Sequence, residues 1–520
     1  MPAAQPPAAL PPSAVWAGFL AMIVGNFMAI LDIQIVASSL REIQAGVSAS
    51  QDEIGWVQTS YLIAEVIAIP LTGILGRAIS MRRLFVFAAL GFTAMSVACA
   101  FAWNIQSLIV FRTLQGFLGG GMIPTTMAAL FLLFPDDKRG PAIVMVGMVS
   151  TLAPSIGPSL GGYITETLGW HWLFLMNLVP GLGCAAMVWK FSPLRRSEPA
   201  LLKSLDVLGL LGMAAMLGSL EYVLDEGPRH EWFDDRGVLL MTAVMVLGGA
   251  LFFWRAFTSA APIVDLKVFA NRNFIIGCLV SMIAGAGLYG SVYLTPLFLA
   301  GVRGYTTMEI GKTMVVAGGA MFLTAPIVGR LQGKMDLRLI LGFGIAATAL
   351  GLWTNAGLTA ESGFWELALP QVLRGAGLMA CIIPMTGIAL GTLPPDRVQN
   401  ASGLFNLTRN LGGAVGLALI HSQLTGSQDL HRQELATAVS NGHADVPGWL
   451  DQTAESLAAQ GAADPSAAAL ARLAGLVERE SLVMAFNNVF VLMALAFAMV
   501  LPLMLFTRVA GKAPAGAGGH

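Results

Sequence analysis

Charged residues are scarce in this chain of 520 residues, of which they make up only 11%. A soluble domain carries about 25% of charged residues. Hydrophobic residues make up 56% of the chain, and its mean hydropathy is +0.72. Only a polytopic membrane protein fits this composition. The chain also lacks a basic tract and has a formal net charge of −1, which argues against a nucleic-acid partner.

Cysteine is scarce too, with four residues in the chain. These lie singly in apolar runs and have neither a disulfide pattern nor a metal-ligand spacing, so we interpret them as core packing: Cys99, Cys184, Cys278 and Cys381. The chain has no His-Glu-x-x-His or Gly-x-Ser-x-Gly motif, which leaves an intramembrane enzyme with little support. We therefore expect no catalytic residues, no metal site and no cofactor. Residues 1–13 contain no basic residue and show no signal peptide.

Apolar stretches fill most of the chain, and each is about long enough for one helical crossing of a bilayer, which takes about 20 residues. We place fourteen of them near residues 15–37, 54–75, 84–103, 105–133, 141–165, 172–190, 205–224, 237–257, 274–300, 309–329, 338–358, 364–391, 401–423 and 484–507. The sequence therefore predicts an all-α polytopic membrane protein with 14 transmembrane helices.

The second half of the chain echoes the first. In residues 70–83 a Pro-x-x-Gly sequence ends an apolar run, and a basic residue follows nine positions after the glycine; residues 326–338 repeat this spacing. Residues 112–116 are echoed in the same way by residues 371–375. Duplicated sets of membrane helices are typical of secondary transporters, whose two bundles move about a site at the midplane. The repeat therefore favours transport.

The repeat pairs spans 1–6 with spans 9–14 and leaves spans 7 and 8 without a counterpart. We therefore expect two six-helix bundles plus two extra helices. The segments expected are a tail at 1–14, a first bundle at 15–190, a linker at 191–204, two extra helices at 205–257, a second bundle at 274–507 with an external loop at 424–483, and a tail at 508–520. Within that loop, Asp464 and Pro465 predict the start of a helix.

Basic residues divide unequally between the two sides of the membrane. Counted over the connections and the span ends, eighteen Lys and Arg residues lie on one side and seven on the other. The side with more Lys and Arg is the cytoplasmic one. We therefore predict that both termini, and the linker at 191–204, are cytoplasmic.

Three glycine-rich motifs lie at defined places in the expected spans. Residues 73–83 join spans 2 and 3, residues 112–121 belong to span 4, and residues 147–162 belong to span 5. Their distinctive members are Gly73, Arg82, Arg83, Gln115, Gly116, Gly147, Pro154, Gly157, Pro158, Gly161 and Gly162. In this order and at these positions they resemble the motifs of the major facilitator superfamily, specifically its fourteen-span drug:proton antiporter branch and the EmrB type of multidrug efflux protein.

The first of these motifs departs from the usual pattern of the superfamily, because Arg77 replaces an acidic residue and Ser80 replaces a glycine. The span-5 motif is similar to the one that marks antiporters. Residues 170–177 and 262–266 are also similar to the fourteen-span branch. Leu31 and Asp32 in span 1 fit the same pattern.

The resemblance implies the major facilitator fold and a proton-coupled antiporter. Such a protein exports lipophilic or amphipathic drugs and toxic compounds across the bacterial inner membrane by alternating access, driven by the proton gradient. EmrB-like exporters work with a periplasmic adaptor and an outer-membrane channel, so these are expected partners beside small lipophilic substrates, protons and membrane lipid. Two alternatives stay open: an exporter of one specific metabolite or siderophore-like compound, and a non-transporting membrane scaffold.

Two acids, Asp32 and Glu65, lie within the expected spans. An ionised carboxylate at this depth must be paired, protonated or facing a cavity, so both are candidates for proton coupling. Arg112 is expected near the depth of Asp32 and needs a carboxylate, carbonyls or water. Glu65 as a plain hydrogen-bonding group and Arg112 as a structural clamp are the alternatives. Other acids are expected at span ends within reach of water: Asp206, Glu221, Glu309 and Glu366.

The glycines of span 5 have a packing explanation of their own. A glycine removes side-chain bulk and lets a partner helix approach closely, while Pro154 and Pro158 remove backbone donors and can bend the helix. We expect these residues to form a close contact between the two bundles. Ordinary packing of small residues is the alternative.

Overall fold

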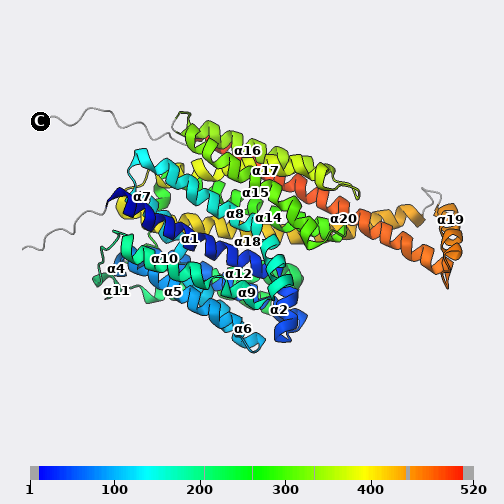
Figure 1. Cartoon of the computed structure of the whole chain (residues 1–520), viewed down its shortest axis with the longest axis horizontal. Coiled ribbons are helices and arrows are strands. Elements are labelled where there is room, and N and C mark those ends of the chain that lie inside the picture. Colours follow the sequence, from blue (N-terminus) through cyan, green and yellow to red (C-terminus); the bar gives the residue numbers. More distant parts are fainter. Residues whose placement is uncertain (1–10, 204, 260–261, 333, 441–445, 507–520) are drawn as a thin grey trace, which may run out of the picture.

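The computed structural model describes residues 11–203, 205–259, 262–332, 334–440 and 446–506, and every regular element in these ranges is a helix (Figure 1). Within them, thirteen helices are long and apolar enough to cross a membrane. They coincide with thirteen of the fourteen expected spans. The remaining one belongs to α18 (Pro395–Ser440), which packs among the other helices but contains buried polar residues such as Asn406 and Arg409.

The first six spans form one bundle. They are α1 (Pro12–Ser38), α4 (Trp56–Ile79), α5 (Met81–Ala100), α6 (Ile105–Gly119) with α7 (Met122–Leu133), α8 (Asp136–Leu168), and α9 (His171–Leu175) with α10 (Leu178–Phe191). Two short helices, α2 (Leu40–Val47) and α3 (Gln51–Ile54), connect α1 to α4.

The last six spans form the second bundle. They are α14 (Arg272–Gly301), α15 (Thr307–Gln332), α16 (Leu337–Thr354), α17 (Phe364–Leu390), α18 and α20 (Pro465–Val500), with η4 (Asn355–Gly357) after α16 and η5 (Leu501–Phe506) after α20. The element between α18 and α20 is α19 (Val446–Ala459).

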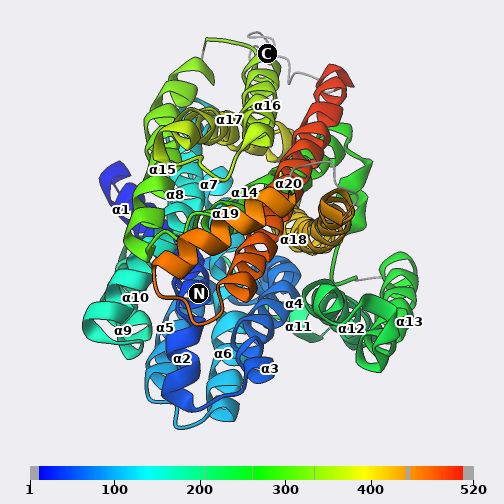
Figure 2. The ribbon, with the colours of Figure 1, turned by 90° about the vertical axis from the view of Figure 1, so that its right-hand side faces the viewer.

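Two spans stand outside both bundles. They are α12 (Val207–Glu226) and α13 (Arg236–Thr258), accompanied by α11 (Ala200–Lys203), η1 (Gly227–Arg229), η2 (Trp232–Asp234) and η3 (Leu266–Ala270). In Figure 2, α12 and α13 lie to one side of the molecule, and α12 packs against both α4 and α18. The expectation that Asp206 reaches water is wrong: it is 6% exposed and pairs with Arg255 at 3.0 Å, which joins the start of α12 to the end of α13.

The last two long helices extend well beyond the bundles. α18 is one helix of 46 residues and α20 one of 36 residues, and with α19 they project from one end of the molecule (Figure 1). The predicted helix start is confirmed, because the Asp464 side chain accepts a hydrogen bond from the Ala467 amide at 3.0 Å. The helix runs further than expected, straight into the last span. We call residues 424–440, 446–459 and 465–480 the extension.

The two ends of the molecule differ. α1 begins and α20 ends at the end opposite the extension, which we call the terminal end (Figure 1). At this end α4 touches α18: the Gln399 amide donates to the Thr72 carbonyl at 3.2 Å, and a Cβ on Gly73 would lie 3.2 Å from the Cα of Asn400. The bundles therefore meet here through backbone and amide groups, without the acid that the usual motif provides.

The rest of that motif acts inside the first bundle. Arg82 lies over the Trp189 ring, 4.5 Å from its centroid, and donates to the Trp189 carbonyl at 3.1 Å. Arg83 is exposed. Ser80 has φ of 84° and ψ of 143°, a region that favours glycine, so the serine in place of the family's glycine holds a strained backbone.

Small residues line the second contact between the bundles, where α8 packs against α15. The glycines of this contact come mainly from α15: a Cβ on Gly318 would lie 3.1 Å from the Cβ of Ser155, and one on Gly329 would lie 2.4 Å from Val144. The expectation that the span-5 glycines form it holds for Gly147 alone, whose Cβ would lie 3.1 Å from Ile383 of α17.

Gly157 and Gly161 of the span-5 motif face α1 of their own bundle. A Cβ on Gly157 would lie 2.4 Å from the Cβ of Gln34, and one on Gly161 would lie 2.8 Å from the Ile35 carbonyl. The earlier assignment of Gly157 and Gly161 to the contact between bundles is therefore wrong. α8 nonetheless runs unbroken through Pro154 and Pro158.

Two adjacent glycines of α15 test this contact. Gly318→Leu should lower the stability by about 1–3 kcal/mol, because the new side chain has no room against Ser155. Gly319→Leu is the matched control: Gly319 is exposed, a Cβ there meets nothing within 4 Å, and the expected change is about 0.5 kcal/mol or less. Thermal unfolding of the purified protein in detergent measures both, and equal melting temperatures would contradict this packing.

Candidate functional site

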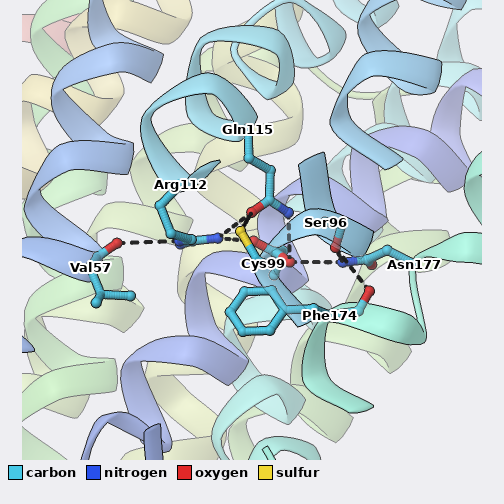
Figure 3. A network of polar contacts seen from close by, with 8 residues as sticks. Val57, Ser96, Cys99, Arg112, Gln115, Phe174 and Asn177 are labelled. Carbon is cyan, nitrogen blue, oxygen red and sulfur yellow. Dashed lines mark hydrogen bonds and ion pairs between the residues drawn. The ribbon is translucent and has the colours of Figure 1, made fainter. Parts of the chain in front are cut away.

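A closed polar network lies inside the first bundle, around the carboxylate of Asp32 in α1 (Figure 3). Arg112 of α6 donates from Nη1 to Asp32 Oδ2 at 2.6 Å, and both side chains are fully buried. Two charges buried together avoid the cost that either would bear alone in an apolar interior. The sequence placed Arg112 near the depth of Asp32 and left its partner open, and the structure pairs the two.

Three amides and hydroxyls complete this network. Asn177 donates to Asp32 Oδ1 at 2.7 Å, and Gln115 donates to the same oxygen at 3.2 Å while accepting from Arg112 at 2.8 Å. Asn177 also donates to Ser96 Oγ at 3.0 Å. Both oxygens of the Asp32 carboxylate are therefore bound, so a change in its charge must be felt by α5, α6 and the start of α10.

Arg112 has further partners on α4. Its Nε donates to the Val57 carbonyl at 3.2 Å, and its guanidinium lies over the Tyr61 ring, 4.2 Å from the centroid. Gly116, one turn later on α6, allows this approach, because a Cβ there would lie 2.3 Å from the Tyr61 carbonyl oxygen. Both alternatives for Arg112 are thus present at once: it pairs with a carboxylate and it clamps a backbone carbonyl.

The second bundle repeats the arginine without the acid. Arg374 of α17 is 2% exposed and donates to Gln371 and, at 3.4 Å, to Thr295 Oγ1. Among the residues that the structure describes, no carboxylate lies within ion-pair distance of Arg374. The two halves share a fold and differ in chemistry, because in the described structure only the first pairs its buried arginine with an acid.

A cavity of about 450 Å³ lies between the bundles in the half of the molecule nearer the extension. It is lined by α1, α4, α8, α12, α14 and α18, and its walls are mainly apolar. The expected site residues divide here. Glu65 of α4 lines the cavity, whereas Asp32 lies behind the wall that its neighbours Ile33 and Gln34 form.

Glu65 is 1% exposed, and its Oε1 atom has no hydrogen-bond partner among the described residues. Arg409 of α18 and Arg112 both attract its carboxylate, so it lies between a cation of each bundle. The expectation that Glu221 sits at a span end within reach of water is wrong. Glu221 is 5% exposed and lines the same cavity from α12.

Sequence reasoning missed two members of this site. Arg409 lies in α18, which is less apolar than the other spans, so the sequence contained no sign that this side chain is buried within the bundles. Tyr289 of α14 lies in the cavity wall, and nothing in the sequence indicated this position. No group of three or more His, Cys, Asp or Glu side chains in the described ranges is arranged to hold a metal ion.

Comparison with known proteins settles the family. The Major Facilitator Superfamily profile matches residues 22–417. The chain belongs to the major facilitator superfamily, among its EmrB-like members. It is 49% identical over 421 residues to the colistin resistance protein EmrB of Acinetobacter baumannii, covering 81% of this chain and 82% of that one. It is 31% identical over 503 residues to the multidrug export protein EmrB of Escherichia coli K12, covering 96% of each.

Solved structures agree on the fold. The human organic anion transporter MFSD10 superimposes with a TM-score of 0.62 at 12% identity, covering 96% of this chain and all of that one. The proton:xylose symporter XylE superimposes with a TM-score of 0.57 at 14% identity, covering 95% and 99%. A member of this superfamily is a multi-pass membrane transporter and not an enzyme, which confirms the class predicted from the sequence.

The two halves offer a matched pair of arginines for a stability test. Arg112→Gln should lower the free energy of unfolding by about 3–5 kcal/mol, because it leaves the buried Asp32 carboxylate without its counter-charge. Arg374→Gln should cost less, about 1–3 kcal/mol, because it removes hydrogen bonds but strands no charge. Denaturant titration of the purified variants compares them. An equal loss at both positions would show that the ion pair adds nothing to the arginine's other contacts.

Proposed function

We propose that this chain is a proton-coupled antiporter that exports lipophilic or amphipathic compounds across a bacterial inner membrane. The observation that carries the proposal is the buried Asp32–Arg112 pair behind the wall of a cavity that two bundles share. The printed names of the relatives, a multidrug export protein and a colistin resistance protein, support export of toxic compounds. No cofactor is proposed, and the proton gradient supplies the energy.

Alternating access follows from the difference between the two ends. The terminal end is held by the contact of α4 with α18, while the cavity lies toward the extension. The excess of Lys and Arg supports a cytoplasmic terminal end. In that orientation the structure corresponds to the state that releases substrate to the periplasm and takes up protons there. Separation of α4 from α18, with closure of the cavity, would give the state that loads substrate from the cytoplasm.

Protonation of Asp32 has an effect on the helices because the charge of Arg112 is permanent. A guanidinium keeps its proton, so protonation of Asp32 removes one charge of the pair and leaves the other. Arg112, Gln115 and Asn177 must then rearrange around a neutral acid. α1 carries Asp32 and, two residues later, Gln34, which lines the cavity and packs on Gly157 of α8. A shift of α1 therefore reaches both the cavity and a helix of the contact between bundles.

Glu65 takes a second role in this proposal. It lies in the cavity wall between Arg112 and Arg409, so its charge affects the attraction between the two bundles. A proton on Glu65 weakens that attraction. In this proposal, binding of a substrate or a proton at Glu65 changes the distance between the bundles. This effect adds to the one that protonation of Asp32 produces.

An exporter of one specific metabolite is the second candidate. The cavity wall is mainly apolar, which supports a broad range of substrates instead. A membrane scaffold would not require a buried ion pair beside a cavity.

Dye extrusion in inverted membrane vesicles tests the proposal. Wild-type protein should transport a lipophilic dye when a proton gradient is imposed and stop when the gradient is collapsed. Asp32→Asn should abolish this transport, at least a hundredfold, because the pair then has no proton to exchange. Asp206→Asn is the matched control, since it also removes an acid from a buried ion pair but lies outside the cavity.

Glu65→Gln should reduce the rate about tenfold or narrow the range of dyes. Full gradient-driven transport by Asp32→Asn would remove Asp32 from the mechanism. Equal loss in Asp206→Asn would indicate a general structural effect instead.

We also propose that the extension docks a periplasmic adaptor, which joins an outer-membrane channel to complete the efflux system. Its described residues are helical, which supports a folded docking element over a disordered spacer. α19 packs on α20 yet has no buried residue, which leaves most of its surface available for a partner. Figure 2 looks onto this end, where α19 crosses in front of the bundles.

Deletion of residues 442–465 removes α19 and tests the docking proposal. The truncated protein should still extrude dye in vesicles at the wild-type rate, because the cavity and the Asp32 network are untouched. It should no longer co-purify with the adaptor or confer drug resistance on cells. Adaptor binding that survives the deletion would place the interface elsewhere.

A further inference from the structure

One wall of the cavity comes from α12, a helix that belongs to neither of the two six-helix repeats. α12 contributes Glu221, Leu224 and Asp225, and η1 adds Arg229 at its end. α12 also packs on α4 and α18, the two helices that touch at the terminal end. The extra helix is therefore part of the cavity and not only a spacer between the bundles.

The two acids that α12 contributes to the cavity wall, Glu221 and Asp225, differ in their hydrogen-bond and ion-pair partners. Asp225 is engaged, because Thr59 of α4 donates to it and Arg229 lies 3.8 Å away. Glu221 has no such partner. It is 5% exposed, its Oε2 atom is buried without a hydrogen bond in the described ranges, and two further acids, Asp225 and Glu65, line the same cavity. A buried carboxylate among acids needs a cation or a proton from outside the protein.

Two more acceptor oxygens without a donor lie in the same cavity wall. They are Oε1 of Glu65 and Oε1 of Gln58, both on α4 and both buried in the described structure. Tyr289 of α14 lines the cavity together with Glu65 and Glu221, and its ring packs on Gly413, where a Cβ would lie 2.4 Å from the ring. The cavity therefore combines unbound acceptors with an aromatic ring and apolar walls.

We propose that Glu221 and Glu65 form a binding site for the protonated amino group of an amphipathic amine, whose apolar body fills the rest of the cavity. An alkylammonium has three N–H donors, which suit the acceptor oxygens on α4 and α12, and its charge favours the face of an aromatic ring. Two cations lie nearby, on α18 and at the rim: Arg409 donates to Asn406, and Arg229 lies within ion-pair distance of Asp225 and Glu226. The site rests on the proposed function, because it names the substrate class of the proposed export cavity.

Binding of a fluorescent amine tests the site. The probe is monodansylcadaverine, which carries one primary ammonium, and its N-acetyl derivative is the neutral analogue with the same apolar body. Both are titrated at pH 7 against the full chain in lipid nanodiscs, without a proton gradient. Wild-type protein should bind the amine at least tenfold more tightly than the acetylated form.

Glu221→Gln should weaken amine binding about tenfold and leave binding of the acetylated form unchanged. Glu221→Asp, which keeps the charge, should stay within threefold of wild type and shows that loss in the glutamine variant is not a folding defect. Glu226→Gln is the matched control on α12, since that acid is bound by Arg229 and His230 and does not line the cavity.

Equal affinity for the amine and its acetylated form, or unchanged amine binding in Glu221→Gln, would overturn the site. Because no gradient is present, these results are independent of dye transport in vesicles. Vesicle transport that persists beside unchanged binding in Glu221→Gln leaves the proposed function standing and rejects the amine site. Loss of amine binding in Glu221→Gln together with absent proton-driven transport supports the site and rejects the antiporter.

Discussion

The burial of one permanent positive charge governs the arrangement of the first bundle. Arg112 is fully buried and cannot release its proton, so the surrounding helices must supply a counter-charge and oxygen acceptors. Asp32 from α1, the Val57 carbonyl from α4 and Gln115 from its own helix do this, and the Tyr61 ring covers the guanidinium face. Three helices, α1, α4 and α6, thereby meet around one side chain, and the charge state of a single carboxylate affects all of them.

The two halves of the chain keep the same fold while dividing the work. The second half carries Arg374 among neutral partners, and its acidic counterpart is absent from the described neighbourhood. The acids that reach the cavity come from α4 and from α12, which lies outside the repeat. The duplicated halves form the two bundles, and α12, which lies between them in the sequence, contributes acids to the cavity wall. Contact between the bodies depends on the smallest residues of α15 and on amides of α18, neither of which carries charge.

Sequence predicted the spans because apolar runs of bilayer length leave few other structures, and it placed Arg112 near the depth of Asp32 while leaving open which carboxylate or carbonyl binds it. The sequence-based predictions were wrong where the contact of a residue depends on which face of its helix it occupies. Gly157 and Gly147 belong to one motif, yet they face different helices, and no residue type indicates which face meets which partner. Glu221 was expected in water because it lies near the end of its span, but the neighbours that bury it come from a helix more than 150 residues away. α18 extended past its span because its polar residues continue the helix instead of ending it.

The length of α18 has a mechanical consequence. At a rise of about 1.5 Å per residue its 46 residues span about 69 Å, more than twice the roughly 30 Å of a bilayer core. The same rod touches α4 at the terminal end and lines the cavity at its middle, while its far portion stands outside the bundles. A rigid rod pivoting near its middle moves its free end in proportion to the length beyond the pivot. A small tilt between the bundles would therefore displace the tip around α19 by a larger distance than it displaces the residues in the cavity wall.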